Sequence, residues 1–273
     1  MILDKLSLEG KVAIVTGGGT GLGKAICLAM ARAGADVVAA ARRIELIEQT
    51  AAEVRKLGRR ALAIPTDITD SRQVNRMVDI TLSEFGRIDI LVNNAGIVRG
   101  DIPRPIWEIT DEDWHLGINT NLTGAFYCSR AVAKHMAERK RGKVINFSSG
   151  FGLRGARDNY MYCCAKGGVI QLTRSLALSL ARDNVQVNAI APGFFATFSA
   201  DSAEARTLFT PERARFIPVG RLGRPDEIGP LAVFLASSAS DYITGEVLVI
   251  DGGGLAGGYA PTGYAPSIAI EED

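Results

Sequence analysis

The chain has little histidine and little cysteine, and both shortages narrow what it can do. Its 273 residues contain two histidines, His115 and His135, and four cysteines, Cys27, Cys128, Cys163 and Cys164. The cysteines have no metal-ligand spacing, and both histidines lie in stretches with a helical pattern. We therefore expect reduced thiols, no bound metal and no Ser/His/Asp triad.

An excess of charge and a long apolar run are also missing. The chain has 31 Lys and Arg against 30 Asp and Glu, which argues against nucleic acid as a partner. No apolar stretch is long enough to span a bilayer, and the first residues lack the basic segment and apolar core of a signal peptide. We expect a cytoplasmic protein that binds neither membrane nor nucleic acid.

Short apolar runs alternate with stretches of helical pattern along the chain. The expected strands are residues 11–16, 36–41, 61–65, 88–92, 144–147, 185–191 and 247–250. This alternation is typical of a doubly wound α/β fold, a mostly parallel sheet with helices on both faces. We expect one such Rossmann-like domain of about seven strands over residues 1–254, with ligands at the carboxyl ends of its strands.

The first apolar run leads directly into a glycine-rich turn, followed by a helical pattern from Lys24. A strand, turn and helix in this order present backbone N–H groups and a positive helix end to a phosphate. The fingerprint G-x-G-x-x-G fits no register here, whereas Thr-Gly-x-x-x-Gly-x-Gly does. We expect a dinucleotide to bind at Gly17, Gly19, Thr20, Gly21, Leu22 and Gly23. A glycine turn without a ligand is the alternative.

The end of the second strand bears on the choice of cofactor. Most NAD-selective folds place an acid there, on the ribose 2′-hydroxyl, but this strand ends at Ala41 and is followed by Arg42 and Arg43. A guanidinium suits the 2′-phosphate of NADP. The alternative is that both arginines are solvated at a helix start, where the positive helix end disfavours cations. We expect NADP(H) to be favoured over NAD(H).

Further candidate cofactor residues follow the other strands. They are Asp67, which could bond the adenine amino group, and Ile68 beside it; Asn94, Ala95 and Gly96; and Pro192, Gly193, Phe195 and Thr197. The Asn93-Asn94 pair is expected to bridge neighbouring strands, and Gly96 would let the backbone approach a ligand.

Tyr162 and Lys166 are four residues apart, so on a helix they lie one turn from each other. A phenol has a pKa of about 10, and a nearby ammonium favours its ionised form, which makes it a better proton donor and acceptor. Ser149 follows the fifth expected strand, and its hydroxyl could hold a carbonyl oxygen beside Tyr162. The Tyr-x-x-x-Lys spacing alone does not establish a catalytic site, because such pairs occur by chance on amphipathic helices.

Several motifs, in this order and spacing, resemble the short-chain dehydrogenases/reductases of the simple one-domain type. They are Thr16-Gly17-x-x-x-Gly21-Leu-Gly23, Asn93-Asn94-Ala95-Gly96, Asn121, Ser149, Tyr162-x-x-x-Lys166 and Pro192-Gly193 with Thr197. The resemblance runs from about Leu6 to Gly254. It is nearest to 3-oxoacyl-carrier-protein reductases and gluconate 5-dehydrogenases.

The resemblance implies an oxidoreductase that transfers a hydride between NADP(H) and a small ketone or secondary alcohol. Tyr162 would be the acid/base, Lys166 would lower its pKa and hold the nicotinamide ribose, and Ser149 would orient the carbonyl. Asn121 would hold a relay water, and Thr197 and the Phe195 backbone would bind the nicotinamide carboxamide. An NAD-dependent alcohol or sugar-acid dehydrogenase is the alternative, followed by a non-catalytic nucleotide-binding regulator.

The last stretches of the chain are less regular. Residues 198–217 have no clean period and mix aromatic residues with arginines, which is typical of a lid. Such enzymes usually end soon after Asp251-Gly-Gly, whereas this chain continues to Asp273 through a repeated Gly-Tyr-Ala-Pro. Relatives of this fold are usually tetramers, so we expect a homotetramer or homodimer with the 255–273 extension docked on a neighbouring subunit. A frayed terminus is the alternative.

Arginines gather in the stretches that follow the strands. Arg154 and Arg157 lie between Ser149 and Tyr162, Arg99 and Arg104 follow Gly96, and the expected lid adds three more. Together with the aromatic residues they would suit a substrate with an apolar body and an anionic end. Solvated loop charges are the alternative.

Overall fold

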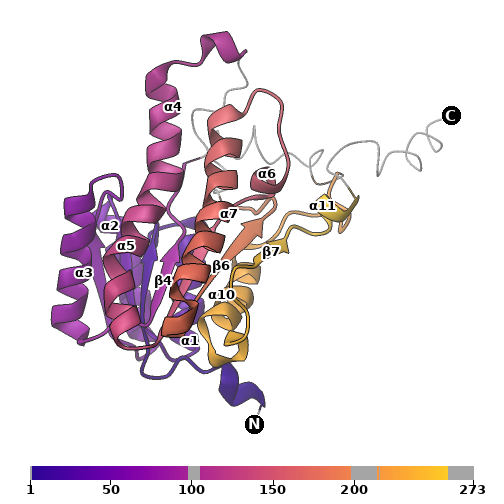
Figure 1. The fold of residues 1–273 in the computed structure, drawn as a ribbon. Coiled ribbons are helices and arrows are strands. Elements are labelled where there is room, and N and C mark those ends of the chain that lie inside the picture. The colour runs from indigo at the N-terminus through magenta and orange to yellow at the C-terminus, as the bar shows by residue number, and fades with distance from the viewer. Residues whose placement is uncertain (1, 98–104, 198–213, 215, 258–273) are drawn as a thin grey trace.

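The computed structural model describes residues 2–97, 105–197, 214 and 216–257. A seven-stranded sheet runs through the centre (Figure 1), with the strand order β3-β2-β1-β4-β5-β6-β7. Every neighbouring pair is parallel. The strands are β1 (Val12–Thr16), β2 (Asp36–Ala41), β3 (Ala61–Pro65), β4 (Ile90–Asn93), β5 (Gly142–Phe147), β6 (Val185–Pro192) and β7 (Val247–Ile250). The expected doubly wound α/β fold is confirmed.

Helices cover both faces of the sheet. One layer contains α1 (Gly21–Arg32), α2 (Ile44–Lys56) and α10 (Ile228–Ala236), and the other contains α3 (Ser71–Phe85), α5 (Gly124–Glu138) and α7 (Tyr160–Leu180). The shorter elements are η1 (Ile2–Leu6), η2 (Ile106–Glu108), α4 (Asp111–Ile118), the π-helical η3 (Asn119–Thr123), α6 (Gly150–Leu153), η4 (Ala181–Asp183), η5 (Pro225–Glu227), η6 (Ser238–Ser240) and α11 (Gly254–Gly257). Helix α4 rises above the sheet in Figure 1.

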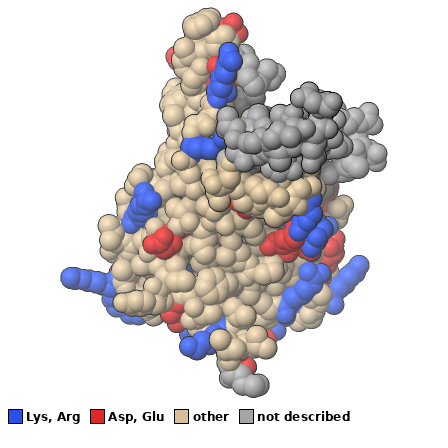
Figure 2. All heavy atoms as spheres, turned by 90° about the vertical axis from the view of Figure 1, so that its right-hand side faces the viewer, with Lys and Arg blue, Asp and Glu red and all other residues tan. Residues whose placement is uncertain are grey.

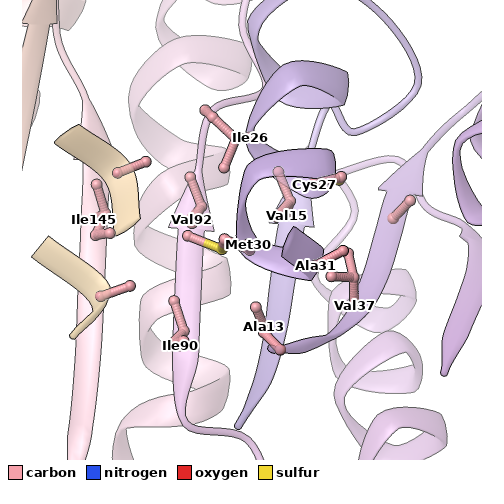
Figure 3. Packing of buried hydrophobic residues seen from close by; sticks show 14 of the residues in the cluster. Ala13, Val15, Ile26, Cys27, Met30, Ala31, Val37, Ile90, Val92 and Ile145 are labelled. Carbon is pink, nitrogen blue, oxygen red and sulfur yellow. The ribbon is translucent and has the colours of Figure 1, made fainter. Parts of the chain in front are cut away.

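Apolar side chains hold the layers together. Ile26 and Met30 of α1 lie against Val15 of β1 and Val92 of β4 (Figure 3), and all four are fully buried. Burying each such side chain contributes about 1.5–3 kcal/mol. Because helices cover β1 and β4 on both faces, the strands read as continuous apolar runs rather than as alternating patterns.

The position of β1 creates the place for a ligand. This first strand pairs with β2 on one side and with β4 on the other. The chain therefore winds outward in opposite directions from the β1/β4 boundary, and a crevice opens there at the carboxyl ends of the strands.

Asp89 lies at the amino-terminal edge of the sheet, just before β4, and connects β1 with Arg87 and with Arg139 at the end of α5. Its buried carboxylate accepts hydrogen bonds from the Arg87 guanidinium at 2.7 and 2.6 Å, from the Val12 N–H at 3.0 Å and from Arg139 at 3.3 Å. Burial alone would raise the pKa of Asp89, but the bonds from Arg87 and Val12 hold that pKa below its usual value. The carboxylate therefore stays charged near neutral pH and anchors the start of β1.

His135 of α5 completes this network. Its Nε2 atom accepts the Ile88 N–H at 3.2 Å and lies 3.3 Å from Arg139 Nη1. A proton on Nε2 would remove this acceptor and place a second cation beside Arg139. Burial, and then the Arg139 charge, accordingly lower the pKa of His135.

This lowered pKa predicts a loss of stability in mild acid. As the pH falls through about 6.5, the unfolded chain takes up a proton on its imidazole while the folded chain resists it, so the free energy of unfolding decreases. Urea unfolding at pH 7.5 and 5.5 measures the effect. His135→Gln should reduce the difference between the two pH values.

The other histidine provides the control. His115 is exposed on α4, so His115→Gln should keep the pH dependence of the wild type. An identical pH dependence in all three proteins would contradict the role given to His135.

Candidate active site

The glycine turn between β1 and α1 is a close-packed cradle. Gly17 and Gly21 have φ angles of +68° and +53°, a left-handed conformation that favours glycine. A Cβ atom on Gly23 would lie 2.1 Å from the Gly17 carbonyl oxygen, and one on Gly19 would lie 3.0 Å from the Leu46 side chain. No larger residue fits at position 23 without moving the backbone.

Helix α1 points its free N–H groups into this cradle. The first hydrogen bond of the helix runs from the Lys24 N–H to the Thr20 carbonyl at 3.1 Å. The N–H groups of Gly21, Leu22 and Gly23 precede it and have no partner within the helix. Together with the positive end of a 12-residue helix, they fit the pyrophosphate of a dinucleotide.

Thr16 and Asn94 tie the turn to β4. Asn94 Nδ2 donates to the Thr16 carbonyl at 2.9 Å, and Thr16 Oγ1 accepts the N–H groups of Asn94 and Ala95 at 3.1 Å each. Thr16 is a site residue whose role the sequence did not reveal. The feature that could have indicated this role is a hydroxyl group at the end of an otherwise apolar strand.

Asn93 makes the expected bridge between strands. Its Nδ2 donates to Asn146 Oδ1 of β5 at 2.8 Å and to Ser129 Oγ of α5 at 3.0 Å. Asn146 in turn donates to Thr173 Oγ1 of α7 at 2.9 Å. This buried polar chain fixes α7 against the carboxyl ends of β4 and β5.

Gly96 lies between Asn121 and Lys166. A Cβ atom on Gly96 would be 2.6 Å from Asn121 Oδ1 and 3.5 Å from Lys166 Nζ. Asn121 Oδ1 accepts the Ile97 N–H at 3.0 Å, and its Nδ2 donates to the carbonyls of Ile97 and Gly117 at 3.0 and 3.1 Å. The side chain therefore positions the loop after β4, and its expected relay water stays a prediction.

Lys166 is buried beneath Tyr162. Its Nζ atom lies 5.6 Å from the centroid of the Tyr162 ring and donates to the Phe147 carbonyl at 2.8 Å. Only 5% of the residue is exposed, and this burial lowers the pKa of Lys166 to about 8. At neutral pH the ammonium is still charged, and it favours negative charge on the nearby phenol oxygen.

Ser149 stands where β5 ends and α6 begins. Its Oγ accepts the Phe151 N–H at 3.2 Å as the cap of α6, which leaves the hydroxyl proton for another acceptor. The Phe151 ring lies edge-on to the Tyr162 ring, with 6.4 Å between centroids. Ser149 thus lies at the carboxyl edge of the sheet, two residues before the ring that packs on Tyr162.

The residues expected at the adenosine end follow β2 and β3. Arg42 and Arg43 are exposed, and in the described part of the chain neither makes an ion pair. The Asp67 Oδ1 atom accepts the backbone N–H and hydroxyl of Thr69 at 2.9 and 2.7 Å. Ile68 is buried against α5, so only its backbone could meet a cofactor.

The residues after β6 lie across the crevice from the glycine turn. Pro192 ends β6, and the Gly193 N–H donates to the Ile250 carbonyl at 2.9 Å. The buried Phe195 accepts the Thr197 N–H at 2.9 Å. A Cβ atom on Gly21 would lie 3.3 Å from Thr197 Cβ, so the two sides meet around the space that a dinucleotide would fill.

Parts of the expected lid and tail lie outside the described residues. Of residues 198–217 only Ala214, Phe216 and Ile217 are described, and Ile217 is buried beside Gly252. Arg99, Arg104 and residues 258–273 are also outside. The start of the extension forms α11, where Asp251 accepts the Leu255 N–H at 2.7 Å.

This crevice and its Ser-Tyr-Lys cluster define a class of dehydrogenases and reductases. Residues 17–254 match the family described as enoyl-(acyl carrier protein) reductase. The chain belongs to the short-chain dehydrogenase/reductase family and is an oxidoreductase.

Individual relatives cover nearly the whole chain. A 2-dehydro-3-deoxy-D-gluconate 5-dehydrogenase from Escherichia coli K12 is 42% identical, covering 94% of this chain and 100% of the relative. A 3-oxoacyl-[acyl-carrier-protein] reductase from Thermotoga maritima is 38% identical, covering 91% and 99%. A solved structure from Agrobacterium tumefaciens, named provisionally as a 2-deoxy-D-gluconate 3-dehydrogenase, has bound NADP. It is 38% identical with a TM-score of 0.83, covering 93% and 99%.

The described ranges contain neither a metal-ligand cluster nor a membrane-spanning helix. No three or more His, Cys, Asp and Glu side chains there come together as metal ligands. None of the helices described is long and apolar enough to cross a membrane. On the face shown in Figure 2, basic and acidic side chains are interspersed rather than gathered by sign.

The buried Lys166 predicts an unusual effect on stability. The drop of its pKa from 10.5 to about 8 corresponds to about 3 kcal/mol of destabilisation below pH 8. Lys166→Met removes this cost but loses a charge-assisted hydrogen bond worth about 1.5–3 kcal/mol. Without cofactor, the variant should therefore be as stable as the wild type at pH 7 or up to about 1.5 kcal/mol more stable, as measured by urea unfolding.

The sign of the pH dependence provides a second check. Between pH 8 and 10.5 the folded lysine is neutral while the unfolded one stays protonated, so the wild type gains stability relative to Lys166→Met. Lys134→Met, at a lysine whose side chain is 86% exposed, should show neither effect. A Lys166→Met protein that is less stable at pH 7 would refute this account.

Proposed function

We propose that the protein transfers a hydride between NADP(H) and a ketone or secondary alcohol, with Tyr162 as the acid/base. The observation that carries this proposal is the charged, buried Lys166 beneath the Tyr162 ring, beside Ser149 and a dinucleotide cradle. When bound, the nicotinamide supplies or accepts the hydride. The residues of the chain handle the proton and the orientation of the substrate.

The roles follow from the contacts of each residue. Ser149 donates its free hydroxyl proton to the substrate oxygen and holds it in place. Tyr162 gives that oxygen a proton in reduction and takes one in oxidation. Lys166 stabilises the phenolate, and its bond to the Phe147 carbonyl keeps the ammonium in position. Asn121 would support the relay of the proton to solvent.

The proposed preference for NADP(H) depends on the end of β2. Ala41 stands where an acid would select NAD, and Arg42 and Arg43 follow with no ion pair inside the described ranges. The relative with bound NADP supports the same choice. Asp67 and Ile68 would contact the adenine, and Thr197 with the Phe195 backbone would contact the carboxamide.

The names of the relatives suggest two kinds of substrate, sugar acids and acyl groups on a carrier protein. A chiefly NAD-dependent alcohol or sugar-acid dehydrogenase is the second candidate function, since the direction depends on the ratio of oxidised to reduced cofactor. A non-catalytic regulator is disfavoured because all four proposed catalytic residues are present in the sequence: Asn121, Ser149, Tyr162 and Lys166.

We also propose that residues 1–254 form one catalytic domain in a cytoplasmic homotetramer or homodimer. The extension 255–273 would dock on a neighbouring subunit through Tyr259 and Tyr264. A solution mass equal to one subunit would contradict this assembly.

Tyr162→Phe tests the chemistry. It keeps the ring and removes the proton, so kcat should fall by about 10²–10⁴, while NADPH should bind as it does to the wild type. Turnover and NADPH fluorescence titration measure the two quantities. A folded variant with near-wild-type kcat would eliminate Tyr162 as the acid/base.

Arg42→Ala tests the choice of cofactor. A charge-assisted bond to the 2′-phosphate contributes about 1.5–3 kcal/mol, so kcat/KM with NADPH should fall roughly ten-fold or more, while kcat/KM with NADH stays within about two-fold. Arg182→Ala, at an exposed arginine on η4, is the control. Equal or better use of NADH by the wild type would overturn the preference.

A further inference from the structure

We propose that Arg154 selects the substrate by binding the carboxylate of a small keto or hydroxy acid whose reacting carbon lies at Tyr162. This proposal rests on the hydride transfer proposed above, and it narrows the substrate to an anion. The geometry that points to it is a guanidinium held over an aromatic ring that itself touches the Tyr162 ring.

The segment that carries Arg154 is fixed beside the site. Helix α6 starts at Ser149, whose Oγ caps it, and the Arg154 N–H donates to the Gly150 carbonyl at 3.1 Å as the helix ends. Gly152 packs tightly on α7, because a Cβ atom there would lie 2.7 Å from the Lys166 carbonyl oxygen. The backbone at position 154 is therefore positioned by the same elements that position Ser149 and Lys166.

Aromatic rings connect Arg154 with Tyr162. The Phe151 ring lies edge-on to Tyr162 and edge-on to Phe194, with 6.4 Å between centroids in both pairs. The Arg154 guanidinium carbon lies 5.2 Å from the Phe151 centroid. The sum of these two distances, 6.4 and 5.2 Å, sets an upper limit of about 12 Å between the Arg154 guanidinium carbon and the Tyr162 ring centroid. This limit is compatible with a molecule whose carbonyl and carboxylate are a few carbons apart.

The surroundings of Arg154 suit the recognition of a carboxylate. A guanidinium offers a planar fork of donors that matches two carboxylate oxygens, and stacking on Phe151 restricts its rotamers before binding. The Phe151 ring, which itself packs on Phe194, provides apolar surface beside the guanidinium, where a charge-assisted bond is stronger than in water. Little side-chain entropy is then lost when the anion binds.

Arg157, three residues further on, lacks these features. Its side chain is 95% exposed, and its Nε lies 3.3 Å from the Asp158 carboxylate. Asp158 also accepts the Tyr160 hydroxyl at 3.0 Å. The two arginines could not be told apart in the sequence, whereas in the structure Arg154 is the one that lies against the ring beside Tyr162. Arg157 is therefore a matched control.

A binding experiment tests Arg154 without turnover. The enzyme with saturating NADPH forms a complex with D-gluconate that cannot react, because both ligands are in the reduced form. NADPH fluorescence measures the Kd of D-gluconate and of its neutral amide, D-gluconamide. We expect the wild type to bind the acid at least about ten-fold more tightly than the amide.

The variants then assign the effect. Arg154→Gln should abolish the preference for the acid, Arg154→Lys should keep part of it, and Arg157→Gln should keep all of it. Unchanged melting temperatures and NADPH affinities would show that the variants are folded. No preference in the wild type, no binding of either ligand, or a preference that survives in Arg154→Gln would overturn the proposal.

Reduction of 5-keto-D-gluconate by NADPH separates this proposal from the proposed function. If the acid binds through Arg154 but neither this keto acid nor a panel of other ketones is reduced, the hydride transfer is wrong and the anion site stands. If ketones are reduced and Arg154→Gln leaves the ratio of acid to amide unchanged in kcat/KM, the function stands and the role of Arg154 is wrong.

Discussion

The buried ammonium of Lys166 is the constraint on which the site depends. Burying the Lys166 ammonium destabilises the fold. The same burial places a positive charge beneath the Tyr162 ring. The ammonium donates a hydrogen bond to the carbonyl of Phe147, the last residue of β5. The chemistry of the phenol is therefore tied to the end of one strand and one turn of α7.

Tight contacts around this lysine keep the geometry unique. A methyl group on Gly152 would lie 2.7 Å from the Lys166 carbonyl, and one on Gly96 would lie 2.6 Å from Asn121 Oδ1 and 3.5 Å from Lys166 Nζ. A buried chain of hydrogen bonds from Asn93 through Asn146 to Thr173 joins β4 and β5 to α7. Such a buried hydrogen-bonded chain favours one arrangement, because any slip would separate the donors and acceptors that it joins.

Much of this architecture could be predicted from the sequence because it depends on local patterns, namely apolar runs and helical periodicity. The expected strand bounds match the structure to within two residues, since each apolar run is followed by a polar residue, a glycine or a proline. The spacing from Tyr162 to Lys166 also required only helical periodicity. The role of Thr16 was not predictable, because its partners Asn94 and Ala95 are 78 and 79 residues away.

Local pattern likewise could not separate Arg154 from Arg157, since the difference lies in which of them meets the Phe151 ring. Nor could it reveal that the helical stretch from α4 to α5 is interrupted by the π-helical η3. Residue types in that stretch are compatible with an unbroken helix. What changes its path is the side chain of Asn121, which bonds the Gly117 carbonyl at 3.1 Å.

The π-helical segment η3 sets how far α4 is rotated about the helix axis relative to α5. A π turn holds about one residue more than an α turn, and each residue of an α-helix advances the side chains by about 100°. If residues 119–123 became a regular α-helix with no residue removed, the extra residue would turn α4 by roughly that angle relative to α5. Gly117, which now packs against Met161 of α7, would then no longer face it. The wide π turn is thus as much a part of the site as the asparagine within it.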